Sequence, residues 1–449
     1  MQENNIGKKI LILGNGFDLA HGLPTSYADF LNFCKCVEYI FDPITTYITE
    51  KNFDDYLSKN WKPLNENFQE NIKIIKDKLC EEFKNRKEKN EDNNNKIYTT
   101  KNKILNEIHN LIKDNFWVFY FINISFGQNW IDFETEIKNI VEPIDKYSNN
   151  DLFSNFYDIV TNIKTEKKYH RWNDIECKKE QDKNFTTLFY YLSIKNKIET
   201  KIIDNIHTVQ DFRDRIEKDL KKLIRALELY LSVFVEDKDI MNNIKPIEVT
   251  NAKIENEKFT FNFEDVDYVI NFNYTNTYEK KYNIKNKEII YVHGKCQKDR
   301  TVEYNTPVLG IDKCSENPKN TIFNGITKIA QRTKNNIKYE ENKILNEIKK
   351  IFNISKEISE IHIFGHSLGI MDSYILKDFL SSESTSIIAY CREPEPEKEY
   401  ERNEKDDRED KIVDLIDKEN KEKKFQNQKI KYLYYTTKEI TSDNQEAPK

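Results

Sequence analysis

The sequence predicts an α/β protein with a mostly parallel sheet and a large α-helical insertion after the first strand. Short apolar runs without polar alternation are typical of parallel strands that are buried on both faces. Stretches with apolar residues at helical spacing separate these runs, and such alternation favours a parallel sheet. The chain of 449 residues is long enough for two or three domains.

Six apolar runs are predicted to be strands of this sheet. They lie at residues 8–14, 267–272, 288–292, 360–365, 386–390 and 430–435. A charged stretch separates the last two runs, and within it four apolar residues share one helical face: Ile412, Val413, Leu415 and Ile416.

The segment between the first two runs is far longer than a strand-to-strand crossover requires. Apolar residues recur at helical spacing over 104–111 and 216–231, which predicts packed helices. We therefore expect a helical insertion domain at residues 31–263, and a sheet domain formed by residues 1–30 and 264–449. The charged run 84–96 is interpreted as an exposed loop or a solvated helix tip.

Composition narrows the functional classes. The net charge of −6 lacks the basic excess of a dedicated nucleic-acid binder, so no specific nucleic-acid partner is expected. No run of about 18 apolar residues predicts a membrane span, and the first residues do not resemble a secretory signal. The seven cysteines form no Cys-x-x-Cys pair, which favours free thiols and gives no metal site. We expect a cytoplasmic protein.

The first motif is Gly14-Asn15-Gly16, directly after the first strand. A Gly-x-Gly turn lets the backbone approach a phosphate, and the N-terminus of the following helix offers N–H donors. Leu19 occupies the position of the third glycine in the usual nucleotide-binding pattern, so a tight turn without a ligand is the alternative.

Two further strand ends carry polar side chains. Asn273 follows the second apolar run, and its amide is suited to hold a water or a sugar hydroxyl. His293, before Gly294, is suited to move a proton near neutral pH. The alternatives are an asparagine-rich turn for the first and a structural histidine for the second.

The fourth motif, residues 364–373, follows another strand and forms a second turn suited to phosphate. An unliganded turn is again the alternative. Gly365-His366-Ser367-Leu368-Gly369 also fits the nucleophile elbow of serine hydrolases. No histidine follows His366, so the chain order of that catalytic triad is not met.

Taken together, these motifs resemble the AbiH family of bacteriophage abortive-infection proteins. The resemblance lies in residues 14–27, 129–134, 272–275 and 292–294, and in 365–368 with Asp372. That family is in turn similar to the sirtuin-like fold, a Rossmann-like NAD-binding sheet. The two Cys-x-x-Cys pairs of protein deacylases are absent, and the helical insertion is not part of the deacylase pattern. Both departures favour NAD hydrolysis over deacylation.

The resemblance implies roles for ten residues. Asn273 and His293 match the catalytic pair. Eight residues are expected to contact NAD: Gly14, Asn15, Gly16, Asp18, Thr275, Gly365, Ser367 and Asp372.

The implied function is antiviral defence by an abortive-infection effector that hydrolyses NAD, its substrate, to nicotinamide and ADP-ribose when activated. Because unregulated hydrolysis would kill the host, we expect the resting protein to be inhibited, by its oligomeric state or by the helical insertion. We also expect a homo-oligomer and a phage-derived trigger. The alternatives are a nucleotide-sensing module without catalysis, and a serine-hydrolase or nuclease-type toxin.

Overall fold

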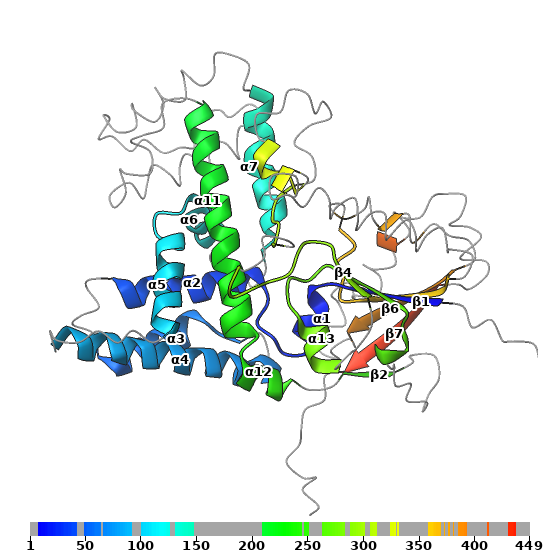
Figure 1. The fold of residues 1–449 in the computed structure, drawn as a ribbon, viewed down its shortest axis with the longest axis horizontal. Helices are drawn as coiled ribbons and strands as arrows, with labels where there is room; N and C mark the ends of the chain where they lie inside the picture. Colours follow the sequence, from blue (N-terminus) through cyan, green and yellow to red (C-terminus); the bar gives the residue numbers. More distant parts are fainter. Residues whose placement is uncertain are drawn as a thin grey trace, which may run out of the picture.

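The computed structural model describes residues 8–42, 49–63, 66–91, 100–125, 131–147, 209–244, 247–250, 263–282, 288–300, 306–311, 324–328, 330–331, 358–369, 372, 376–377, 380, 385–392, 411–412 and 430–436 (Figure 1). Among the described helices, none is sufficiently long and apolar to cross a membrane.

Seven strands form one sheet. In spatial order they are β2 (Glu248–Thr250), β7 (Ile430–Thr436), β6 (Ser386–Arg392), β5 (Ile358–Phe364), β1 (Lys8–Leu13), β3 (Tyr268–Asn271) and β4 (Glu288–Tyr291). All neighbours pair in parallel except β2 and β7. The predicted mostly parallel α/β sheet is confirmed. Strand β2, within the range predicted to be mainly helical, has only three residues, which are too few to produce a recognisable pattern.

The order of the strands reverses at the centre of the sheet. From β1 the chain forms β3 and β4 on one side, and then β5, β6 and β7 on the other. Leu13 pairs with both Asn271 and Phe364, and Asn271 pairs with Tyr291. Because these four strands end in one row, the residues that follow them meet at one edge of the sheet. Ligands of open α/β sheets bind at this edge, where the strand order reverses.

Helices fill most of the described chain between β1 and β2, and they gather on one side of the sheet (Figure 1). They are α1 (Asn15–Ala20), α2 (Tyr27–Phe41), α3 (Glu50–Asn60), α4 (Glu66–Glu91), α5 (Thr100–Ile112), α6 (Phe116–Ile124), α7 (Phe133–Tyr147), α11 (Val209–Leu229), the π-helical η4 (Tyr230–Val235) and α12 (Lys238–Asn243). Helix α13 (Thr277–Tyr282) and the 3-10 turns η5 (Phe263–Asp265) and η6 (Asn324–Ile326) follow β2. Part of the charged run 84–96 is thus helical, as far as Glu91, and its last residues lie outside the described chain.

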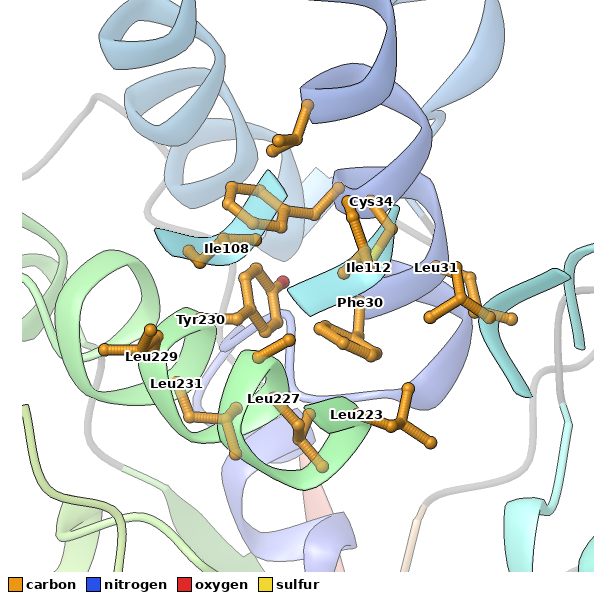
Figure 2. Close-up of a cluster of buried hydrophobic side chains, with 14 of the residues drawn as sticks. Phe30, Leu31, Cys34, Ile108, Ile112, Leu223, Leu227, Leu229, Tyr230 and Leu231 are labelled. Atoms are coloured by element: carbon orange, nitrogen blue, oxygen red, sulfur yellow. The ribbon is translucent and has the colours of Figure 1, made fainter. Parts of the chain in front are cut away.

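Both predicted helical stripes form core. Ile108 of α5 and Leu223 and Leu227 of α11 pack with Phe30 and Cys34 of α2 (Figure 2). The sheet has a separate apolar cluster on each face, which explains why its strands lack polar alternation. Ile412 is buried in one of these clusters, whereas Val413, Leu415 and Ile416 lie outside the described residues.

Asn115 joins α6 to α11. Its Oδ1 accepts hydrogen bonds from the backbone of Trp117 and Val118 at 3.0 and 3.3 Å, which caps the helix. Its Nδ2 donates to the carbonyl of Asp219 in α11 at 2.8 Å. The Asp219 carboxylate in turn accepts from the backbone N–H of Phe116 at 3.0 Å.

We expect Asn115→Ala to lower the free energy of unfolding by about 1–3 kcal/mol, because a helix cap and a buried hydrogen bond are both lost. Urea unfolding measures this change. Asn123→Ala is the matched control, since the Asn123 amide donates within its own helix, to the carbonyl of Phe119. Equal midpoints for the two variants would contradict this account of the junction.

Candidate functional site

Two glycine turns interlock where the strand order reverses. The N–H of Gly14 donates to the carbonyl of Phe364 at 3.0 Å, and that of Gly16 to the carbonyl of Gly365 at 2.8 Å. A Cβ atom on Gly14 would lie 2.3 Å from His366 Cα, and one on Gly16 would lie 2.6 Å from Gly365 Cα. The backbones of the two turns therefore touch, and side chains at these positions would separate them.

The same hydrogen bonds limit what the first turn offers a ligand. The N–H groups of Gly14 and Gly16 are occupied by the second turn, and that of Phe17 donates to the carbonyl of Gly14. The glycines thus allow the backbones of the two turns to approach each other, in addition to allowing a phosphate to approach the backbone. The polar groups of Asn15 and of the Ser367 turn remain at the surface, since both residues are exposed.

A cavity of about 420 Å³ lies over the interlocked turns, within the size range of small-molecule sites. It is lined by all ten predicted site residues. Its other wall comes from the helical segment, through Tyr27, Ile131, Asp132, Glu134, Leu227 and Leu231. Sheet and helices therefore share one site.

Asn273 is anchored by its backbone and side chain. Its N–H donates to Asn271 Oδ1 at 2.9 Å, and its Nδ2 donates to the carbonyl of Gly14 at 3.0 Å. The Asn273 Oδ1 accepts no hydrogen bond from the described part of the chain. That oxygen is thus positioned to accept a hydrogen bond from a water or a hydroxyl group in the cavity.

Asp18 is a buried carboxyl at the cavity. Its Oδ2 accepts a hydrogen bond from Thr275 Oγ1 at 2.5 Å, and Thr277 contacts Thr275 at 3.2 Å. Its Oδ1 has no hydrogen-bond partner among the described residues. Burial raises the pKa of Asp18 to about 7, although the threonine hydroxyls oppose the shift. Thr275, which was predicted to contact NAD, therefore also holds the Asp18 carboxyl in place.

Asp372 lies between two histidines. His293 Nε2 is 3.0 Å from Asp372 Oδ1, and His366 Nε2 is 3.4 Å from Asp372 Oδ2. His366 Nδ1 accepts from the backbone N–H of Leu368, so its proton is on Nε2, facing Asp372. Burial alone would raise the pKa of Asp372, but His293 and Lys328 hold it well below its usual range.

Glu134 and Lys328 complete the site, and neither was among the predicted site residues. Lys328 Nζ is 2.8 Å from Glu134 and 3.6 Å from Asp372 Oδ1, and its side chain is fully buried. Burial would lower the pKa of Lys328, but the two carboxylates raise it above its usual value. Burial raises the pKa of Glu134 to about 7, against the opposing effect of Lys328. The 129–134 motif was a signal for Glu134, whereas Lys328 belongs to no motif.

The geometry does not favour a serine nucleophile. Positive φ angles occur at Gly365 and Leu368 and not at Ser367, although a nucleophile elbow strains the serine itself. Ser367 is exposed and makes no hydrogen bond to a histidine in the described chain. Within the same described part, no group of three or more His, Cys, Asp or Glu residues is arranged to hold a metal ion.

The family assignment rests on a comparison with protein-family models over most of the chain. The model of the family described as bacteriophage abortive infection AbiH matches residues 10–139 and 116–391. The chain belongs to the AbiH family. Searches of curated proteins and of solved structures gave no significant match. The predicted AbiH resemblance is confirmed, and the likeness to sirtuins stays a prediction. Of the AbiH motifs, Asn129 and Trp130 lie outside the described residues, while Asp132 caps α7 through Glu134 and Thr135.

We expect Gly365→Ala to destabilise this AbiH protein strongly. The φ of Gly365 is +68°, and an added Cβ would lie 2.1 Å from the backbone N of Phe17. The strained backbone alone costs about 1–3 kcal/mol. Gly369→Ala is the control, because its Cβ would meet only Ser367 Oγ at 3.6 Å. Thermal unfolding of both variants tests the contact, and equal melting temperatures would argue against it.

The raised pKa of Asp18 makes stability depend on pH. The folded state retains the Asp18 proton up to about pH 7, whereas the unfolded chain releases it near pH 4, so stability falls as pH rises between these values. Asp18→Asn removes this cost, which is at most about 4 kcal/mol because one pKa unit is worth about 1.4 kcal/mol.

Urea unfolding should show Asp18→Asn more stable than wild type at pH 8 and similar to it at pH 4. Asp265→Asn serves as the control, because it makes the same substitution at an exposed position. A constant difference between Asp18→Asn and wild type across this pH range would contradict the assigned pKa.

Proposed function

We propose that this AbiH protein is a sirtuin-like NAD glycohydrolase, which cleaves NAD into nicotinamide and ADP-ribose when it is activated during phage infection. The observation that carries the proposal is the convergence of Asn273 and His293 on one cavity with both glycine turns. Numbered along the chain, the six parallel strands lie in the order 3-2-1-4-5-6, which is the order of Rossmann sheets. We infer that the helical segment is an insertion in such a nucleotide-binding domain.

The cavity offers groups of the kind that a dinucleotide needs. Asn15, Ser367 and Lys411 line it and supply polar and cationic groups for the pyrophosphate. Asn15 Oδ1 accepts from Thr25 at 2.7 Å, which leaves its amide N–H groups as donors. The unpartnered Oδ1 of Asp18 is a suitable acceptor for a ribose hydroxyl.

The proposed reaction breaks the bond between the nicotinamide nitrogen and C1′ of the ribose. Nicotinamide leaves as a neutral molecule with the bonding electrons, while positive charge develops on the sugar. A water held by Asn273 Oδ1 adds its oxygen to C1′. His293 accepts the proton of that water at Nδ1, and Asp372, which faces Nε2, stabilises the imidazolium.

Nicotinamide release by purified protein, with and without lysate of phage-infected cells, tests the proposal. We expect Asn273→Ala and His293→Ala to reduce release by about 10²-fold or more, because each removes a group that acts on the attacking water. Ser367→Ala should mainly raise KM and leave kcat near that of wild type, since we assign Ser367 to phosphate binding.

Undiminished release by Asn273→Ala and His293→Ala would contradict the proposal, as would the absence of release from activated wild type. NAD binding without turnover would favour the nucleotide-sensing alternative. Complete loss of activity in Ser367→Ala, with activity retained in Asn273→Ala and His293→Ala, would favour a serine hydrolase.

A further inference from the structure

A chain of charged residues beside the cavity joins the helices to the sheet. Glu134 of α7 contacts Lys328 at 2.8 Å, Lys328 lies 3.6 Å from Asp372, and Asp372 lies 3.0 Å from His293. His366 joins the same carboxylate at 3.4 Å. These residues come from four separate parts of the sequence, since His366 and Asp372 belong to one motif, so only the folded chain brings the two ends together.

Lys328 is shared between two carboxylates. A fully buried ammonium group needs a paired negative charge, and both Glu134 and Asp372 supply one. Lys328 lies closer to Glu134, at 2.8 Å, than to Asp372, at 3.6 Å. Its positive charge therefore compensates the charge of Asp372 only in part. Asp372 therefore retains negative charge for the histidines, and the extent to which it does so depends on Glu134.

The position of Glu134 is fixed by the helical core. Its neighbour Phe133 is fully buried and stacks on Tyr27 and Phe121, with ring centroids 4.1 and 4.0 Å away. Asp132 caps the first turn of α7 through the backbone N–H of Glu134 at 3.0 Å. A displacement of α7 would thus carry Glu134 away from Lys328.

We propose that Glu134 is a positioning residue, which acts through Lys328 to set how strongly Asp372 pairs with His293. The helical segment thereby takes part in the chemistry of the sheet. The role of His293 in hydrolysis rests on the proposed function, but the charge coupling does not. Among the described residues, Asp132, Tyr27 and Tyr274 also lie near this chain of charges, and Asp18 and Lys411 line the same cavity. Burial raises the pKa of both tyrosines, so they stay neutral.

Histidine titration by NMR of the full chain tests the coupling directly, with signals assigned from His293→Asn and His366→Asn. In Glu134→Gln, Asp372 is the one carboxylate partner left to Lys328 among the described residues, so the pKa of His293 should fall by about half a unit. In Lys328→Met, the two histidines are the charged partners left to Asp372 in the described part of the chain, so the pKa of His293 should rise by about as much. A purely structural role predicts no such opposite shifts.

Three further variants serve as controls. Glu134→Asp keeps the charge and should recover part of the shift. Glu134→Gln/Lys328→Met removes both charges and should fold better than Lys328→Met alone, in which part-buried Glu134 has lost its cation. Glu279→Gln breaks an ion pair with Lys295 of 2.6 Å that does not line the cavity, and it should leave the titration unchanged.

The acidic limb of the pH profile of nicotinamide release should move with the pKa of His293, to lower pH in Glu134→Gln and to higher pH in Lys328→Met. Shifts of His293 in one direction for both variants, or no shifts, would overturn the inference even if wild type hydrolyses NAD. Opposite shifts in the two variants, together with a wild type that does not turn over NAD, would support the coupling and contradict only the proposed function.

Discussion

The direct contact between the backbones of residues 14–16 and 364–366 is the constraint on which the rest of the site depends. Backbone hydrogen bonds of 2.8 and 3.0 Å join the two turns, and the distances leave no room for a Cβ at Gly14, Gly16 or Gly365. The carboxyl ends of β1 and β5 are thereby fixed side by side where the strand order reverses. Asn273 depends on this contact too, because its amide donates to the carbonyl of Gly14.

The charged residues above the turns make the cavity a joint property of the sheet and the helices. Burying Lys328 would be costly if either carboxylate were removed, and its two partners come from α7 and from the end of the sheet. A binding site built in this way changes when the helices move relative to the sheet. A displacement of the helical segment would therefore alter the pairing of Asp372 with His293.

The six parallel strands could be predicted from the sequence because each is a continuous apolar run. The candidate site residues could be predicted because they lie in short polar motifs that directly follow such runs. Gly14, Asn273, His293 and Ser367 are all found in this way, and the structure brings them to one cavity. Lys328 could not be found, because one lysine in a chain with 71 Lys and Arg residues shows no pattern until its carboxylate partners in the fold are known.

The occupied N–H groups of the first turn could not be predicted either, because they depend on a contact between segments about 350 residues apart. Strand β2 was missed because three residues establish no period.

A structure of the His293→Ala variant with NAD would test the central claim most directly. The account predicts NAD in the cavity between sheet and helices, with its pyrophosphate beside Asn15 and Ser367 and its nicotinamide ribose beside Asn273. NAD bound elsewhere on the chain, or an empty cavity at saturating NAD, would contradict it.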